Sequence, residues 1–142
     1  DTALEWYGKS LVIHEEQYGT DHPRTATALY HSIGFVHYQK NDTDKALDYY
    51  FKAMAIYENI AKEDNGIKPS LANTYNNIGV VYGKKGDIDT KLEYCLKALE
   101  IEEKSLGKTH PSTKLSYKNI LLTYKELGDM ENANLYKEKV GL

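Results

Sequence analysis

The chain has 142 residues, a formal net charge of −3 and a hydrophobic content of 41%, which suits one soluble globular domain with a real core. No apolar run approaches the roughly 20 residues that a membrane-spanning helix needs, and no secretory leader is visible. The single cysteine excludes an internal disulfide, and the acidic balance gives no general attraction to nucleic acid or anionic membranes. These features predict a cytoplasmic protein that binds neither nucleic acid nor a membrane.

Seven segments carry apolar and aromatic residues at helical spacing, so each is expected to form an amphipathic helix. In chain order the predicted helices cover residues 1–18, 24–40, 43–63, 70–85, 88–106, 112–127 and 130–140. Three of them begin near Pro23, Pro69 or Pro111, where a proline loses no helical hydrogen bond. In "KKGD" and "ELGD" a glycine ends one helix and an aspartate caps the next, and Asn41 replaces the glycine in "QKND". The sequence therefore predicts an all-α fold of antiparallel helix pairs.

The helices fall into two alternating groups, which we name helices A and helices B. "ALYHSIGFVHYQKND", "NTYNNIGVVYGKKGD" and "LSYKNILLTYKELGD" belong to helices A and begin at residues 28, 73 and 115. "ALEWYGKSLVIHE", "ALDYYFKAMAIYE" and "KLEYCLKALEIEE" belong to helices B and begin at residues 3, 46 and 91. A repeated helix pair that cannot bury its apolar face alone must stack on its neighbours, so the pattern predicts an α-solenoid.

The helices A resemble the tetratricopeptide repeat, whose pattern contains W-x2-L-G-x2-Y. In "YNNIGVVY", Tyr75 takes the Trp place, Ile78 and Gly79 form the Leu-Gly pair, and Tyr82 takes the Tyr place. In "YHSIGFVH" a histidine replaces the last tyrosine, and in "YKNILLTY" Leu121 replaces the glycine. The leucine predicts a slightly wider spacing of the last helix pair.

The long repeat and the turns "GTDHP" and "GKTHP" are similar to the kinesin light chain type of this family, although the middle turn, "KEDNGIKPS", lacks the histidine. The resemblance implies a right-handed solenoid in a single domain over residues 1–142. Its parts would be a helix B of a preceding repeat at 1–18 and three repeats at 24–63, 70–106 and 112–140. Because the first helix B lacks its own helix A, we expect the chain to be a fragment of a longer protein.

The resemblance also implies that helices A line a concave groove that holds an extended peptide or protein segment. The residues expected in the groove are His31, Ser32, Phe35, Asn73, Asn76, Asn77, Val80, Lys84, Lys118, Asn119 and Leu122. Family members clamp the peptide backbone with groove asparagines, and Asn77 and Asn119 occupy the matching place; one carboxamide can donate and accept at once. Phe35, Val80 and Leu122 recur at one place and would form an apolar floor. The alternative is that asparagine is simply tolerated on a wet helix surface.

Charge predicts the kind of peptide. The helices A carry Arg24, Lys84, Lys85, Lys114, Lys118 and Lys125 against one acid, Glu126, so the acidic residues, among them Glu102, are expected on the helices B. A basic groove would favour acidic peptides, unless the lysines are solvated at its rim. Of the places where chaperone-tail-binding members of the family hold a terminal carboxylate, only Asn77 carries a suitable residue, so that ligand is not expected.

No catalytic site, cofactor or metal site is predicted. The five histidines lack the i, i+3 or i+4 pairing that suits zinc on a helix, and no catalytic triad order or glycine-rich phosphate loop is found. Cys95 falls at a core place and is expected to be a buried apolar group. The tyrosines recur at fixed repeat places, which indicates packing rather than nucleic-acid stacking.

Two alternatives to peptide binding remain. Leu4, Leu11 and Trp6 of the first helix lack cover in a solenoid, so the chain could self-associate through its ends. It could also act as a regulatory or sensor domain whose ligand alters the curvature of the solenoid.

Overall fold

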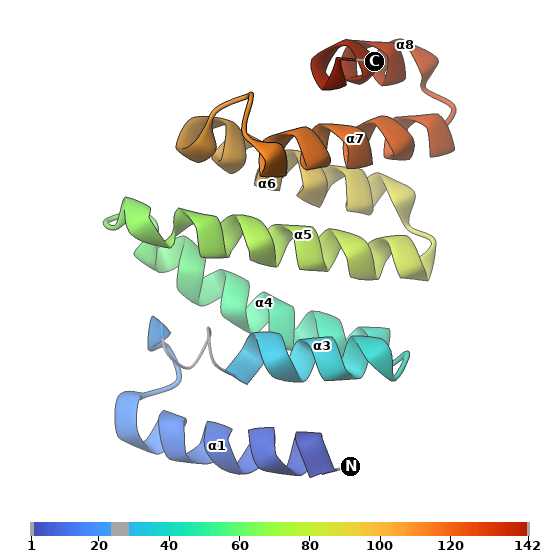
Figure 1. Cartoon of the computed structure of the whole chain (residues 1–142). Coiled ribbons are helices and arrows are strands. Elements are labelled where there is room, and N and C mark those ends of the chain that lie inside the picture. Colours follow the sequence, from blue (N-terminus) through green and yellow to red (C-terminus); the bar gives the residue numbers. More distant parts are fainter. Residues whose placement is uncertain (1, 24–28, 142) are drawn as a thin grey trace. The chain divides into compact units, whose positions relative to one another are not determined.

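The computed structural model of the chain describes residues 2–23 and 29–141, and these residues form helices and turns without a strand. The helices are α1 (Thr2–Tyr18), α3 (His31–Gln39), α4 (Thr43–Ile60), α5 (Lys68–Lys85), α6 (Ile88–Leu106), α7 (Pro111–Glu126) and α8 (Met130–Val140), with a short 3-10 turn, η2 (Asn65–Ile67), before α5. Figure 1 shows that successive helices run in opposite directions. The predicted all-α fold of paired helices is therefore confirmed.

The predicted boundaries lie within two residues of the observed ones, except in two helices. The described part of the predicted helix 24–40 is α3 with a π-helical turn at residues 29–30; residues 24–28, which include Arg24, lie outside the described residues. The predicted helix 43–63 ends at Ile60, because the next amides bond to carbonyls three residues back, Lys62 N to Asn59 O at 3.4 Å and Glu63 N to Ile60 O at 3.0 Å. Such tighter bonding ends an α-helix.

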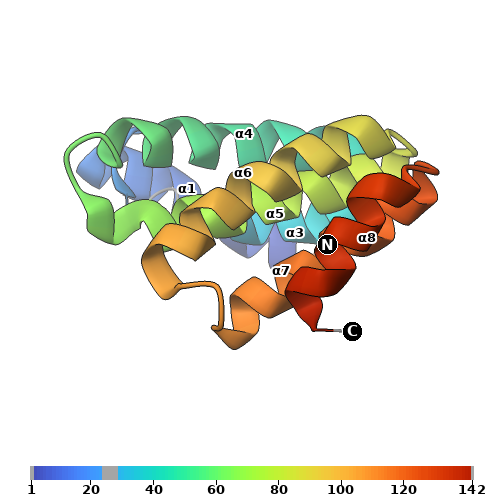
Figure 2. The ribbon, with the colours of Figure 1, turned by 90° about the horizontal axis from the view of Figure 1, so that it is seen from above.

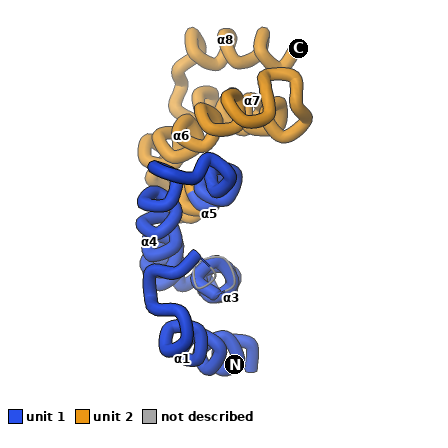
Figure 3. The backbone as a smooth tube through the Cα atoms, turned by 90° about the vertical axis from the view of Figure 1, so that its left-hand side faces the viewer, with its two compact units in different colours: residues 1–74 blue, residues 75–142 orange. Residues whose placement is uncertain are grey.

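The chain divides into two compact units, residues 1–74 and residues 75–142, which Figure 3 draws in two colours. The boundary falls within α5.

The predicted turn chemistry is confirmed at all three short A-to-B connections. The residue that ends each helix A has a left-handed backbone, with φ of 65° at Asn41, 83° at Gly86 and 76° at Gly128. Each following aspartate accepts a backbone N–H three residues on: Asp42 from Lys45 at 3.3 Å, Asp87 from Thr90 at 3.1 Å and Asp129 from Asn132 at 3.1 Å. The caps end one helix and start the next within a few residues, which forces the antiparallel return.

In unit 1 the helices α3 and α4 pack closely because α3 has a glycine at its centre. A Cβ atom placed on Gly34 would lie 2.9 Å from Cε1 of Tyr50, whose ring is only 3% exposed. This core also includes residues that are less than 9% exposed, among them Leu29, Tyr30, Ile33, Ala46, Leu47, Ala53, Ile56 and Tyr57.

In unit 2 the helices α6, α7 and α8 enclose a second core (Figure 1; Figure 2). Its buried members are Leu99, Tyr117, Ile120, Leu121, Ala133 and Tyr136. Leu121 is 4% exposed, so the leucine that replaces the family glycine is part of this core. The opposite face of α7 is left in solvent, and that face helps to form the candidate site.

Candidate functional site

A surface cavity of about 420 Å³ in unit 2 lies between the C-terminal part of α5, α6 and α7. It is lined by Asn76, Val80, Lys91, Cys95, Glu102, Ser112, Leu115, Ser116, Asn119 and Leu122. Four of the residues predicted for the groove, Asn76, Val80, Asn119 and Leu122, therefore come together around one hollow. Its volume lies within the range of small-ligand and side-chain pockets.

Three apolar side chains of this cavity are open to solvent. Val80 is 50% exposed, Leu115 59% and Leu122 53%. They remain outside because the other faces of the same helices are used for packing: Ile78 and Ile120 are both fully buried. Covering apolar side chains that are about half exposed is favourable, so this wall can contribute to the binding of an apolar group.

The polar centre of the cavity is Glu102 of α6. Its carboxylate accepts a hydrogen bond from Nδ2 of Asn76 at 3.2 Å and one from Oγ of Ser116 at 2.5 Å. As expected, this acid belongs to a helix B, and the structure places it among the residues that line the cavity. One face of α6 carries Lys91, Cys95 and Glu102, which are spaced at i, i+4 and i+11. This spacing could have predicted that the three side chains line the same cavity.

Lys91 and Cys95 of α6 lie against two glycines of α5. A Cβ atom on Gly79 would be 3.2 Å from Sγ of Cys95, and one on Gly83 would be 2.9 Å from Cδ of Lys91. Lys91 Nζ lies 3.3 Å from a carboxylate oxygen of Glu126. Cys95 is half-buried at the cavity wall instead of fully buried in the core, and burial raises the pKa of its thiol, which keeps it protonated.

The remaining predicted groove residues of α5 and α7 lie elsewhere on the surface. Asn73, Lys84 and Lys118 are exposed and Asn77 is half-buried, and none of the four is among the residues that line the cavity. The structure therefore does not bring Asn77 and Asn119 together in the cavity, and the asparagine clamp stays a prediction.

In unit 1 the predicted groove residue His31 is held by its neighbours. Its Nε2 lies 2.8 Å from Oγ1 of Thr74, whose hydroxyl donates to the carbonyl of Ser70 at 2.8 Å, so the imidazole must be the donor. The ring meets Tyr50 and Tyr57 edge-on at 5.7 and 5.9 Å. Burial lowers the pKa of His31. This histidine therefore bridges elements of unit 1.

The other predicted residues of α3 differ in accessibility. Ser32 is half-buried, whereas Phe35 is 51% exposed and repeats the open apolar place of Val80 and Leu122. The predicted floor residues are thus all solvent-accessible in their own units.

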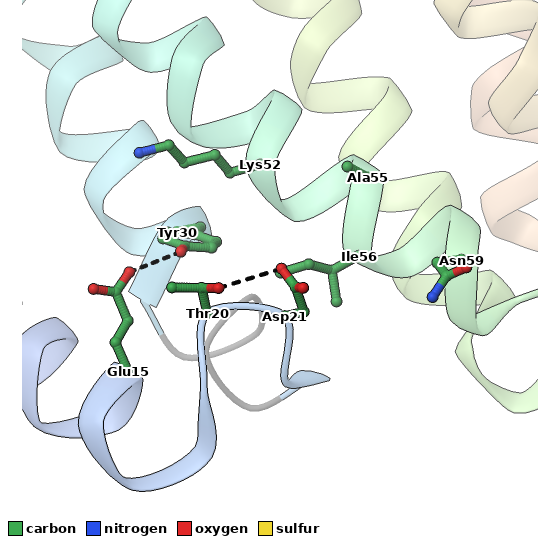
Figure 4. Close-up of a pocket in the computed structure, with 8 residues that line it drawn as sticks. All are labelled: Glu15, Thr20, Asp21, Tyr30, Lys52, Ala55, Ile56 and Asn59. Atoms are coloured by element: carbon green, nitrogen blue, oxygen red, sulfur yellow. Dashed lines mark hydrogen bonds between the residues drawn. The ribbon is translucent and has the colours of Figure 1, made fainter.

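A second cavity, of about 460 Å³, lies in unit 1 between the end of α1, the start of α3 and α4 (Figure 4). At its edge the hydroxyl of Tyr30 donates to Glu15 at 2.9 Å, and the Tyr117 hydroxyl donates to Glu103 in the same way in unit 2. Burial and then the hydrogen-bonded carboxylate raise the pKa of Tyr30 and of Tyr117 to about 12. This link was not predicted from the sequence, although a glutamate precedes each tyrosine by 14 or 15 residues.

Among residues 2–23 and 29–141, no group of three or more histidine, cysteine, aspartate or glutamate side chains could hold a metal ion. In the same part of the chain, no helix is both long and apolar enough to cross a membrane.

The comparisons with known proteins agree with this architecture. The family model of the tetratricopeptide repeat matches residues 1–59 and 70–140. No curated protein sequence matches the chain.

Solved structures with this fold include BtubC (BKLC) from P. vanneervenii, with a TM-score of 0.81 and 22% identity over 97% of this chain and 54% of that one. A Podosopora anserina protein assigned as a kinesin light chain with nearly identical TPR-like repeats has a TM-score of 0.81 and 20% identity over 96% of this chain and 63% of that one. The chain thus spans between half and two thirds of the length of these structures, and the likeness shows a shared all-α solenoid fold.

Proposed function

The chain belongs to the tetratricopeptide repeat family, whose members are in general interaction scaffolds without enzymatic activity, and we propose on this premise that it binds an extended peptide segment of a partner protein on the exposed face of its helices A. The observation that carries the proposal is the cavity with three open apolar side chains, Val80, Leu115 and Leu122, beside the polar groups of Asn119 and Glu102. An apolar anchor with a few convergent polar groups is the usual composition of a recognition pocket. The protein would act without catalysis or cofactor, in the cytoplasm.

The charges around the cavity determine which peptide fits. Glu102 would repel an acidic side chain at the centre of the cavity, so the segment that lies there should be apolar or carry a hydrogen-bond donor. Acidic side chains of the ligand would instead lie toward Lys118, which is exposed on α7 and does not line the cavity. The proposed ligand is therefore an apolar anchor residue with acidic residues beside it.

A peptide-display selection against the immobilised chain tests the proposal. The selected peptides should contain an apolar anchor next to acidic residues, and their affinity should fall about tenfold or more in an Asn119→Ala/Leu122→Ser variant. Both replaced side chains are exposed, so the fold should survive. Lys118→Glu should weaken only the acidic peptides.

The matched control is Asn134→Ala/Leu135→Ser, which changes the same two residue types on the exposed face of α8. This variant should bind the selected peptides as the unchanged chain does. Equal losses in both variants, or a selection that returns no enriched peptide, would contradict the proposal.

A second candidate function is self-association through α1, because this helix has an uncovered apolar face. Trp6 is 68% exposed and Ile13 58%, although they take the repeat places of Tyr49 and Ile56 in α4. Tyr49 stacks on His37 of α3 with ring centroids 5.8 Å apart, and Ile56 is 7% exposed.

The partner that would cover this face of α1 is α1 of a second copy of the chain. Light scattering over a concentration series should then show a mass above 16.2 kDa that Trp6→Ser/Ile13→Lys abolishes; a constant mass of one chain would exclude it.

A further inference from the structure

The turn between α6 and α7 lies beside a third cavity, of about 330 Å³, which shares no residue with the proposed peptide site. It is lined by Lys108, Thr109, Lys114, Tyr117, Lys139, Val140 and Gly141. We name it the lysine cavity. It is the repeat counterpart of the unit 1 cavity of Figure 4, because Tyr117 takes the place of Tyr30 and Lys139 that of Lys52.

The two counterparts differ in charge. Among the described residues, the unit 1 cavity is lined by two carboxylates, Glu15 and Asp21, and by one ammonium group, Lys52. Among the described residues, the lysine cavity is lined by three ammonium groups and by no carboxylate. Since the shared tyrosine and lysine follow from the repeat, the added Lys108 and Lys114 are what distinguishes the lysine cavity.

One lysine of this cavity, Lys139, is positioned by aromatic neighbours. Nζ of Lys139 lies 5.4 Å from the centre of the Tyr117 ring and 4.8 Å from that of Tyr136, so cation–π attraction holds it at the wall. Lys114 belongs to the first turn of α7, where the helix dipole adds positive potential, while the end of α8 at Gly141 opposes it. The carboxylate of Glu103 accepts the hydrogen bond of the Tyr117 hydroxyl and is not among the groups that line the cavity.

From this arrangement we propose that the lysine cavity binds a phosphate monoester, carried by a phosphorylated side chain of a partner protein. An ammonium group offers three donors and no acceptor, and a phosphate monoester offers three acceptor oxygens with a charge of about −1.5 to −2. Three lysines therefore match the three acceptor oxygens and the charge of a phosphate monoester better than they match a single carboxylate. The volume accommodates a single phosphorylated side chain, and the net charge of −3 gives the chain no general attraction to nucleic acid or anionic lipid.

The test uses the whole chain labelled with ¹⁵N and follows its amide resonances. Inorganic phosphate, exchanged against chloride at constant ionic strength, should shift the amides of Thr109, Lys114 and Gly141. The amides of Thr20 and Asp21 in the unit 1 counterpart should stay unchanged. A phosphoserine peptide should give the same shifts at lower concentration, and its unphosphorylated form should give none.

A Lys108→Gln/Lys114→Gln variant should bind the phosphopeptide about tenfold more weakly, because two of the three charge-assisted hydrogen bonds are lost. The control Lys125→Gln/Lys137→Gln removes the same charge from exposed sites of unit 2 outside the cavity and should leave the affinity unchanged. The proposal is overturned by equal shifts in chloride and phosphate, by equal losses in both variants, or by binding to phosphatidic acid vesicles without binding to the phosphopeptide.

Discussion

The helix pairs α3–α4 and α7–α8 have equivalent contacts between their two helices, but the large residue of the contact lies on opposite partners. In α3–α4 a glycine, Gly34, faces a large ring, Tyr50, at a separation that leaves no room for a Cβ atom. In α7–α8 the place of the glycine holds Leu121, which is buried, and the place of the tyrosine holds Lys137, which is exposed. The bulk that α4 supplies in one pair is thus supplied by α7 in the other. Close packing constrains the total volume at the contact, and either helix can supply it.

The pair α5–α6 lies between these two extremes. Gly79 faces Cys95, and a Cβ atom on the glycine would lie 3.2 Å from the sulfur. The smaller partner leaves the sulfur at the wall of the candidate site, which explains why Cys95 is accessible where Tyr50 is not. The choice of residue size in a helix pair therefore also shapes the surface.

The largest effect should come from Leu121→Ala, which removes the side chain that fills the α7–α8 contact. Because Leu121 is 4% exposed, the free energy of unfolding should fall by about 3 kcal/mol, the usual cost of a buried leucine. Urea unfolding followed by circular dichroism measures this. A loss below about 1 kcal/mol would contradict this prediction. It would mean that side chains of α8, and not Leu121, fill the contact between α7 and α8.

A smaller loss should follow Gly34→Ala in the α3–α4 pair. Alanine favours a helix by about 1 kcal/mol over glycine, but the new methyl group meets the buried Tyr50 ring, so the net change should be a loss of about 1 kcal/mol. Gly8→Ala in α1 is the matched control, since a Cβ atom there has no neighbour within 4 Å. The control should gain stability by up to about 1 kcal/mol, and a gain at both sites would contradict the size comparison.

The smallest effect should be a dependence of stability on pH that comes from His31 of the α3–α4 pair and has no counterpart at the same place of α7. Burial lowers the pKa of His31 below its ordinary value of about 6.5, so the unfolded chain binds this proton more readily than the folded chain does. The contribution of His31 to the free energy of unfolding should therefore be fully present above about pH 6.5, the pKa in the unfolded chain. It should decline as the pH falls from there toward the pKa in the folded chain. In α7 the same place holds Lys118 instead of a histidine.

The variant His31→Gln should flatten this slope between about pH 7 and 5 while the chain remains folded. Unfolding curves at several pH values measure it. An unchanged slope in the variant would assign the dependence to other groups.

The helices and their caps could be predicted because their signals are local. The left-handed turn residue and the aspartate of each short connection are neighbours in sequence, and the open apolar place of Phe35, Val80 and Leu122 recurs with the repeat. The end of α4 was predicted three residues too late, because none of the three residues that follow Ile60 is a glycine or proline that would stop a helix.

The polar part of the candidate site could be predicted only in part. Glu102 accepts hydrogen bonds from Asn76 and Ser116, which lie 26 and 14 residues away on other helices, and periodicity in one helix does not report such partners. The lysine cavity was missed for the same reason, since Lys108, Lys114 and Lys139 come from a turn and two helices. Repeat alignment indicates which places are equivalent, but the charges that meet in space depend on the packing of several segments.

The exchange of volume between Gly34 and Tyr50 also bears on how such chains can be recombined. Both partners of the contact belong to one helix pair, so a duplicated or transplanted pair carries its own complementary surfaces with it. A crossover inside a pair would instead join Leu121 to Tyr50 and overfill the contact, or join Gly34 to Lys137 and leave it empty. Viable chimaeras of this protein should therefore have their junctions in the loops between pairs, at the turns that begin with Gly19 and Gly107.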